Sequence, residues 1–249
     1  HRDLHSFPTR RSSDLLCLCL VLAAGQALAA ETLTLASGAG YKQMVEDLAV
    51  AFTKETGVEL ERIYGNMGQI TGMARESGKV DAVLGDKRFL DGTDLPFSGE
   101  YVIGKGVLVL VVAKGAPVSA LKDLTRPEIK RVAMPDPQKA IYGRAAGECL
   151  DSTGLRAALQ DKLIVVATVP QVSAYVISGE VDAGFINRTD ALAIQDKVAR
   201  VLAVDEAAYK PILIVAKPLT GAPHAKALER FAAFLKGQAA KDIAARHGL

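Results

Sequence analysis

The chain has 249 residues, a formal net charge of +2 and 23% charged residues, a composition typical of a globular protein. This near balance of charge argues against a nucleic-acid-binding protein, which needs a basic face. With no tryptophan and only 5% aromatic residues, the chain also lacks the side chains on which single-stranded bases stack. We therefore expect no nucleic-acid partner.

The first 30 residues are predicted to lie outside the folded protein. Residues 1–15, HRDLHSFPTRRSSDL, resemble translated sequencing-adapter sequence, and we interpret them as non-native. Residues 15–30 form an apolar run with a small-residue cleavage pattern at Ala27-Leu28-Ala29, which is typical of a signal peptide. The alternative is a buried N-terminal helix. Because the run is shorter than a membrane span of about 20 residues, we expect a soluble periplasmic protein with no stable membrane insertion of the mature chain.

Removal of this signal peptide would leave Cys149 as the only cysteine. A single cysteine cannot form an internal disulfide, and an exported protein gains nothing from a free reactive thiol. We expect Cys149 to face the core from a helix.

Short apolar runs alternate with helical patterns from Glu31 onward. The first series is predicted to contain strands at 33–35, 58–64 and 80–84 and helices at 40–56 and 70–76. The second is predicted to contain strands at 132–134, 163–167 and 183–186 and helices at 144–150 and 172–177. Strands that alternate with helices indicate parallel-rich sheets flanked by helices, an α/β fold. The tail, 223–249, is predicted to form packing helices.

Two long apolar strands bracket the second series, at Gly106–Ala113 and Pro211–Lys217. They indicate two crossings between two lobes: lobe I, 31–110 plus 213–249, and lobe II, 111–212. A site between the lobes needs hinge closure, and we expect the crossing strands to bend near Val112 and Ile214.

One sequence pattern occurs twice, as SGKVDAVLGD at 77–86 and SGEVDAGFIN at 178–187. Each copy closes a helix with Ser-Gly, where glycine suits the left-handed position, and then enters an apolar strand. Chance similarity between two helix-to-strand turns is the alternative to an internal repeat. Asp81 and Asp182 are expected to bond the local turn backbone. Ligands of parallel α/β sheets bind beyond the carboxyl ends of strands, so a cleft is expected where the copies end.

Three strand-to-helix junctions contain glycine: residues 36–42 (ASGAGYK), 64–69 (YGNMGQ) and 135–144 (PDPQKAIYGR). A helix start leaves backbone N–H groups without partners, and its positive dipole end favours an anion. Glycine lets a ligand approach this backbone closely. A plain turn is the alternative at each junction, but three in two lobes favour an anion-binding cradle.

Patterns typical of enzymes are missing from the sequence. After the predicted signal peptide, only His224 and His247 remain, and the sequence contains no nucleophile-elbow, paired-histidine metal or phosphate-loop motif. We expect no cofactor, no metal site and no catalytic residue. Carboxylate catalysis stays open as an alternative, since Asp81, Asp86, Asp136 and Asp182 are available.

Six motifs, in this order and spacing, carry a family resemblance over nearly all of residues 31–249: LTLASGAG, YGNMGQI, VDAVLGDKRFLD, VAMPDP, SGEVDAGFINRTDA and FLKGQAAKDIAARHGL. The chain resembles the periplasmic molybdate-type substrate-binding proteins of ABC transporters. The resemblance implies a two-lobed type II periplasmic-binding-protein fold whose two crossing strands act as a hinge. It further implies a monomer that holds an oxyanion between its lobes and delivers it to a membrane permease.

The sequence differs from the family pattern at the positions that contact the ligand in the family. Serine hydroxyls of the family fall on Gly40 and Met67, and its tyrosine falls on Asn187. Each lost hydroxyl removes a charge-assisted bond of about 1.5–3 kcal/mol. Backbone N–H groups, with Gln69 among the polar side chains, could compensate. The expected ligand-binding residues are Ser37, Gly38, Gly40, Tyr41, Asn66, Met67, Gly68, Tyr142, Arg144, Val169 and Asn187.

Two questions stay open. Arg144 would add a bidentate donor if it faced the cleft, and solvent exposure is the alternative. The ligand is expected to be molybdate, tungstate or a related oxyanion. The alternatives are another small anion, an anionic metal complex, or an enzyme built on the same scaffold.

Overall fold

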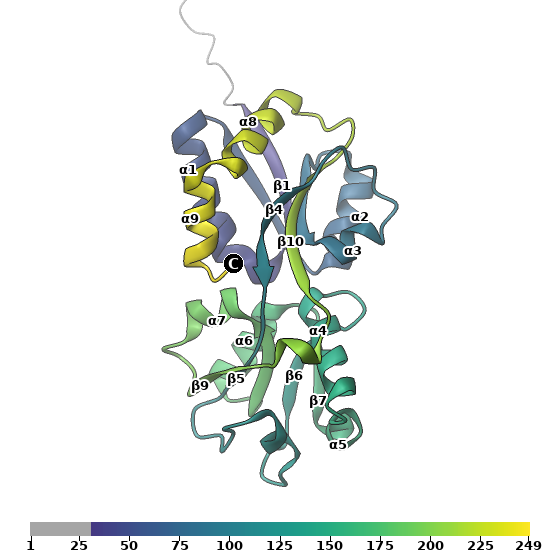
Figure 1. Cartoon of the computed structure of the whole chain (residues 1–249), viewed down its shortest axis with the longest axis vertical. Coiled ribbons are helices and arrows are strands. Elements are labelled where there is room, and N and C mark those ends of the chain that lie inside the picture. The colour runs from purple at the N-terminus through teal and green to yellow at the C-terminus, as the bar shows by residue number, and fades with distance from the viewer. Residues whose placement is uncertain (1–30) are drawn as a thin grey trace, which may run out of the picture. The chain divides into compact units, whose positions relative to one another are not determined.

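The computed structural model describes residues 31–249, so the predicted non-native segment and signal peptide lie outside the described residues. Figure 1 shows two five-stranded mixed sheets with helices on both sides. In spatial order, the first sheet contains β2 (Glu59–Gly65), β1 (Thr32–Gly38), β3 (Ala82–Asp86), β10 (Ile212–Pro218) and β4 (Tyr101–Gly106). The second contains β7 (Leu163–Val166), β6 (Val132–Pro135), β8 (Ala183–Asn187), β5 (Leu108–Val112) and β9 (Arg200–Ala203). The predicted two-lobed α/β fold is confirmed.

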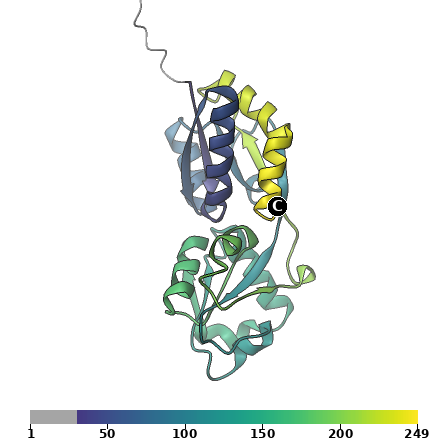
Figure 2. The same cartoon turned by 90° about the vertical axis from the view of Figure 1, so that its left-hand side faces the viewer.

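Helices cover both faces of each sheet (Figure 1). Around the first sheet are α1 (Lys42–Thr56), α2 (Met67–Ser77), α3 (Lys87–Asp91), α8 (Ala225–Lys236), α9 (Gln238–Arg246) and the 3-10 helix η1 (Ala39–Tyr41). Around the second are α4 (Ile141–Ser152), α5 (Arg156–Leu159), α6 (Val169–Ser178) and α7 (Arg188–Ile194), with the 3-10 helices η2 (Leu121–Thr125), η3 (Gln160–Lys162) and η4 (Glu206–Ala208). Helices α1 and α9 pack side by side (Figure 2).

The two sheets share one topology. In the first, β2, β1 and β3 are parallel, and the antiparallel β10 joins them to the edge strand β4. In the second, β7, β6 and β8 are parallel, and the antiparallel β5 joins them to β9. The antiparallel strand of each sheet directly follows a crossing from the other sheet. The chain therefore exchanges one strand in each direction.

The change of sheet falls earlier than the predicted boundary between residues 110 and 111. The apolar run at 106–113 is not one strand, because β4 ends at Gly106 in the first sheet and β5 begins at Leu108 in the second. Lobe I therefore comprises 31–106 and 212–249 from here on, and lobe II comprises 108–203. An unbroken apolar run in the sequence does not show whether its residues belong to one sheet or to two.

Hinge bending near Val112 and Ile214 stays a prediction. Both side chains are fully buried, Val112 is the last residue of β5, and the pairing of β10 with β4 shifts register between Ile214 and Val215. The chain crosses between the sheets at Val107 and over residues 204–211, which lie outside the paired strands.

The repeated SGxVDA pattern has the same structural role in both lobes. Gly78 and Gly179 follow the last turns of α2 and α6 with φ angles of 62° and 76°, in the left-handed region. Glycine adopts this conformation without the steric cost that a Cβ would add. The pattern thus stops a helix and turns the chain into the next parallel strand.

The two aspartates of this pattern bond neighbouring strands rather than their own turns. The carboxylate of Asp81 accepts the backbone N–H of Thr34 in β1 at 2.7 Å. That of Asp182 accepts N–H groups of Lys130 and Arg131, just before β6, at 2.7 and 2.9 Å. Each aspartate ties the start of the central strand to the strand beside it, a long-range contact that a local reading of the turn could not predict.

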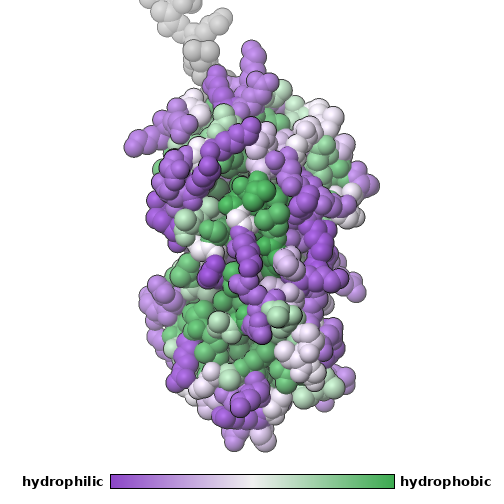
Figure 3. Space-filling view, in the orientation of Figure 1, coloured by the Kyte–Doolittle hydropathy of each residue, from purple (hydrophilic) through white to green (hydrophobic). Residues whose placement is uncertain are grey.

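The apolar stripe predicted on α1 packs into the core of lobe I. Phe52 is fully buried and meets the ring of Phe231 from α8 edge-on, with centroids 5.2 Å apart. In lobe II, Cys149 is fully buried on α4, as expected, and burial raises the pKa of its thiol to about 11. On the face seen in Figure 3, apolar residues gather around a groove of about 240 Å³ beside α7, β5 and β9.

The left-handed glycines generate a stability prediction. Gly179→Ala forces a Cβ into the left-handed region and is expected to cost roughly 1–2 kcal/mol, or several degrees in Tm. Gly72→Ala is the matched control, because Gly72 lies inside α2 and a Cβ there meets nothing within 4 Å. It should stabilise the protein by about 0.5–1 kcal/mol. Thermal unfolding measures both, and equal Tm values for the two variants would contradict the proposed role.

Candidate ligand-binding site

The starts of several helices meet at one small cavity between the lobes. Its volume is about 20 Å³, room for roughly one water molecule. The residues that line it are Gly38, Ala39, Gly40, Tyr41, Gly65, Asn66, Met67, Ala140, Ile141, Tyr142, Thr168 and Val169. They come from all three glycine junctions and from the start of α6, so the predicted junctions are brought together, with a fourth beside them.

Each of these helices contributes its first residue to the cavity wall. Met67, Ile141 and Val169 open α2, α4 and α6, and Ala39 opens the 3-10 helix before α1. Within residues 31–249, the backbone N–H groups of Met67, Ile141 and Val169 have no hydrogen-bond partner. An orphan N–H at the positive end of a helix is suited to an anionic acceptor.

These helices begin one turn earlier than the apolar periodicity predicts. The structure places their starts at Met67, Ile141 and Val169 rather than at residues 70, 144 and 172. Periodicity detects residues that face the sheet. The first turns face the cavity instead, so they lack that pattern.

Asn66 explains the local structure of the YGNMGQ junction. Its Oδ1 accepts the N–H of Gln69 at 2.9 Å, and its own N–H donates to Oε1 of Gln69 at 2.9 Å, which forms a capping box. Its Nδ2 donates across the lobes to the carbonyl of Ala167 at 3.2 Å. Gln69 therefore serves the helix cap through its Oε1 and backbone N–H, and it does not line the cavity.

Two more direct hydrogen bonds join the lobes around the cavity. The N–H of Gly68 donates to the carbonyl of Lys139 at 3.2 Å, and Nδ2 of Asn187 donates to the carbonyl of Gly40 at 2.8 Å. A Cβ on Gly40 would lie 2.7 Å from Oδ1 of Asn187, so glycine is required for this close approach. Oδ1 of Asn187 is buried without a partner.

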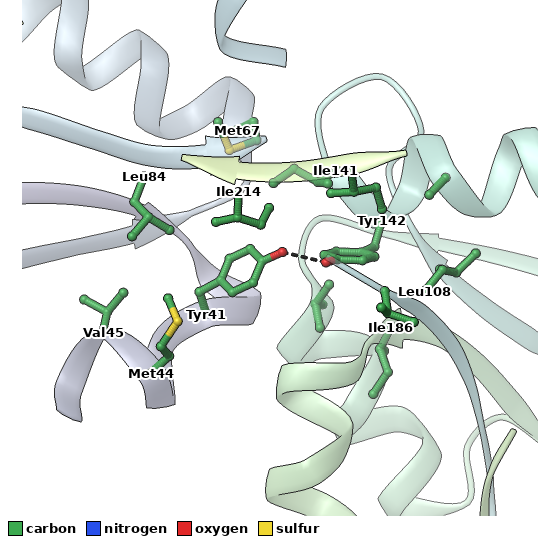
Figure 4. Packing of buried hydrophobic residues seen from close by; sticks show 14 of the residues in the cluster. Tyr41, Met44, Val45, Met67, Leu84, Leu108, Ile141, Tyr142, Ile186 and Ile214 are labelled. Carbon is green, nitrogen blue, oxygen red and sulfur yellow. Dashed lines mark hydrogen bonds between the residues drawn. The ribbon is translucent and has the colours of Figure 1, made fainter. Parts of the chain in front are cut away.

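Tyr41 and Tyr142 meet across the lobes at the cavity. Their hydroxyl oxygens are 2.5 Å apart, and both side chains are almost fully buried. Figure 4 shows the two hydroxyls facing each other, with Ile141 beside Tyr142 and Met67 on the lobe I side. Burial raises the pKa of both phenols above the ordinary value of about 10. Both hydroxyls therefore stay protonated at neutral pH and remain able to donate.

Four of the predicted site residues do not line the cavity. Ser37 is fully buried in β1, and its hydroxyl donates to the carbonyl of Gly38 at 3.3 Å. Gly68 and Asn187 are used in bonds between the lobes. Arg144 is turned away from the cavity, because its guanidinium lies 4.8 Å from the ring centre of Phe89 in α3. In this position it contributes no donor to the cavity wall.

Sequence reasoning did not name five of the residues around the cavity: Ala39, Gly65, Ala140, Ile141 and Thr168. Ala39, Gly65 and the Ala140–Ile141 pair lie inside the three junctions, so their positions were available as a signal. Thr168 precedes the first residue of α6, where the N-cap preference for threonine is the available signal.

The side chains that line the cavity are all uncharged. Within residues 31–249, His, Cys, Asp and Glu side chains form no group of three or more that could hold a metal ion. An anion in this cavity would be held by neutral N–H and O–H donors. A cation would meet no carboxylate there.

The four aspartates considered for catalysis all accept backbone N–H groups. Besides Asp81 and Asp182, Asp86 caps α3 by accepting from Phe89 at 3.1 Å, and Asp136 accepts from Gln138 at 2.8 Å. Burial raises the pKa of Asp86 despite this bond. These carboxylates hold neighbouring strands, turns and helix ends in place.

Two lobes, exchanged strands and a neutral cavity lined by helix starts define a protein that binds a small solute between its lobes. The profile of the bacterial extracellular solute-binding proteins matches residues 33–249, and the chain belongs to that family. Its members bind substrates for transport and are not enzymes. Among the residues that the structure describes, no helix is long and apolar enough to cross a membrane.

Individual relatives are similar along most of their length. The molybdate-binding protein ModA of Rhodobacter capsulatus is 27% identical over 250 residues, with 97% of each chain covered. A Bacillus subtilis lipoprotein, YvgL, for which a substrate-binding role in an ABC transporter has been proposed, is 25% identical and covers 87% of this chain and 85% of its own. The periplasmic molybdate-binding protein of Azotobacter vinelandii superposes with a TM-score of 0.80 at 23% identity, with 87% of this chain and 97% of that chain covered.

The buried phenols generate a pH prediction. A group whose folded pKa is raised contributes stability below its unfolded pKa, and that stability is lost as the pH rises through the folded pKa. Stability should therefore fall above about pH 10, because the unfolded chain ionises its phenols while Tyr41 and Tyr142 stay neutral. Denaturant unfolding between pH 8 and 11 should show a smaller fall for the Tyr41→Phe/Tyr142→Phe variant than for the wild type. Tyr175→Phe is the control, because Tyr175 is a half-buried tyrosine of α6. If the stability of all three proteins fell equally with pH, the raised pKa of Tyr41 and Tyr142 would be contradicted.

Proposed function

We propose that this chain captures a small oxyanion of the molybdate type between its lobes and delivers it to an ABC importer. The carrying observation is the convergence of Ala39, Met67, Ile141 and Val169, the first residues of four helices, on one cavity. Among the residues that the structure describes, the N–H groups of Met67, Ile141 and Val169 have no partner. Molybdate is the ligand in the names of two of the similar proteins.

Neutral donors suit such a ligand. Several N–H dipoles can hold an oxyanion without a cation, because each helix start carries about half a positive charge. The ligand-binding residues in this proposal are the expected residues that line the cavity, namely Gly38, Gly40, Tyr41, Asn66, Met67, Tyr142 and Val169. With Arg144 turned away, a ligand that needs a bidentate cation, such as a carboxylate, is less favoured.

The changed positions leave a second candidate of the same class. Gly40 and Met67 stand where serine hydroxyls are expected from the resemblance, and Met67 brings an apolar, polarisable side chain to the cavity wall. A softer anion or an anionic metal complex would fit this wall better than a strongly hydrated oxyanion. The ligand panel described below separates the two candidates.

Transport requires a membrane partner. For a similar protein, a substrate-binding role in an ABC transporter has been proposed. Together with the family's extracellular role, this supports a periplasmic location and a permease that receives the ligand. We further propose that the protein acts as a monomer.

A thermal-shift panel on residues 31–249 tests the ligand. An anion supplied at 100 times its Kd should add about 2.7 kcal/mol to the free energy of unfolding. We expect molybdate and tungstate to raise the Tm by several degrees, and sodium chloride at matched ionic strength to have no such effect. A shift with another anion and none with molybdate or tungstate would favour the second candidate, and no shift with any anion would overturn the proposed function.

Asn66→Asp tests the sign of the ligand's charge. Aspartate keeps the oxygen that caps α2 but loses the Nδ2 that donates to Ala167, so the free energy of unfolding should fall by about 1–3 kcal/mol. It also places a negative charge on the cavity wall, so molybdate affinity should fall at least tenfold. Asn66→Ser is the control, since serine is an equally good cap without the charge. Isothermal titration of both variants measures the difference, and equal affinities would contradict an anionic ligand.

A further inference from the structure

The cavity is too small for the ligand unless a contact between the lobes opens. Its volume of about 20 Å³ holds roughly one water molecule, whereas a tetrahedral oxyanion has five heavy atoms. Ligand entry must therefore separate groups that now touch. The candidates are the direct contacts between lobes I and II at the cavity.

Most of these contacts use polar groups that are already committed elsewhere. The side chain of Asn66 is held by the capping box of α2 in addition to its bond to Ala167. Asn187 donates to the carbonyl of Gly40 but does not itself line the cavity. Tyr41 and Tyr142 differ, because both line the cavity and, among the described residues, their hydroxyls form a hydrogen bond only with each other.

The two phenols carry two hydroxyl protons, and the hydrogen bond between them uses only one. Each hydroxyl has one proton and can also accept, so one O–H donates to the other oxygen. The second O–H has no acceptor among residues 31–249. A donor buried beside a cavity without an acceptor points to a ligand or water that supplies one.

The rings cannot move the hydroxyls elsewhere. Tyr41 is 1% and Tyr142 2% exposed, so neither phenol reaches bulk solvent. A Cβ on Gly106 would lie 2.4 Å from the Tyr142 hydroxyl, so this oxygen lies directly against the end of β4 at the crossing to lobe II. Figure 4 shows the two rings held by Met44, Ile214 and Leu108 on their respective sides.

We propose that Tyr41 and Tyr142 are the specificity-determining hydroxyl donors of this site, and that one oxygen of the ligand inserts between them. One bond between phenols is then replaced by two bonds to the anion, one from each lobe. The two phenols supply the hydroxyl donors that Gly40 and Met67 lack. The inference rests on the proposed function, because it requires an anionic acceptor in the cavity.

A double-mutant cycle tests this arrangement. Tyr41→Phe and Tyr142→Phe each keep the ring and remove one hydroxyl. Isothermal titration with molybdate and tungstate should show each single variant about tenfold weaker than the wild type, and the double variant at least a hundredfold weaker. Tyr64→Phe is the matched control, since its hydroxyl bonds Glu46 at 2.7 Å outside the cavity, and it should bind as the wild type does.

A merely structural link between the lobes gives a different result. If the phenols bonded only each other, removing either hydroxyl would break the same bond, and the double variant would match each single variant. That outcome, or wild-type affinity in all variants, would overturn the proposal. Failure of the wild-type protein itself to bind either anion would instead overturn the proposed function, and this inference with it.

A spectroscopic measurement on the wild type needs no variant to fold. The chain contains no tryptophan and six tyrosines, so its near-ultraviolet absorption reports phenols. Saturation with molybdate should produce a tyrosine difference spectrum that Tyr64→Phe retains and the double variant loses. Bound molybdate with no change in wild-type tyrosine absorption would also overturn the proposal.

Discussion

The backbone amides at the starts of helices are the constraint on which this structure depends. The first residues of a helix have N–H groups that no carbonyl within the helix can reach, and burying them without an acceptor is unfavourable. In this chain, α2, α4 and α6 all begin at the same cavity with such groups at Met67, Ile141 and Val169. The exchange of strands between two sheets of identical topology brings the carboxyl ends of both parallel sets toward this point. An acceptor that enters the cavity therefore satisfies groups from both lobes at once.

The same constraint explains the neutral walls and the close contact of the lobes. A cationic side chain would add charge where the helix ends already supply it, and the lining residues include none. Carbonyl groups of one lobe accept side-chain N–H groups of the other, as Gly40 does for Asn187 and Ala167 does for Asn66. In the proposed function, ligand binding competes with such direct contacts between the lobes for polar groups at one interface. Affinity depends on the difference between them, and not on the ligand contacts alone.

Most of the fold could be predicted from periodicity, but the site could be predicted only in part. Alternating strands and helices indicate the two lobes, and glycine at each junction indicates where helices begin. The errors fall where residues serve the cavity or a crossing instead of a sheet face. Apolar periodicity places the starts of α2, α4 and α6 a full turn too late, and it predicts one strand at 106–113 although two sheets share this run. The spacing of residues does not show where a side chain points. The sequence therefore could not predict that Arg144 packs on Phe89 or that the hydroxyls of Tyr41 and Tyr142 meet.

The strand exchange also determines the order in which the protein can be completed. Lobe II is one continuous stretch, 108–203, so every strand of its sheet is present once β9 has been synthesised. Lobe I begins first but has to wait, because β10 inserts between β3 and β4, and β4 pairs with no other strand of its sheet. Until the ribosome has released this segment, β3 presents an unpaired edge, a feature that promotes aggregation. Lobe I is therefore synthesised first but completed last. A chain truncated before residue 212 would contain all strands of the lobe II sheet but would lack β10 of lobe I.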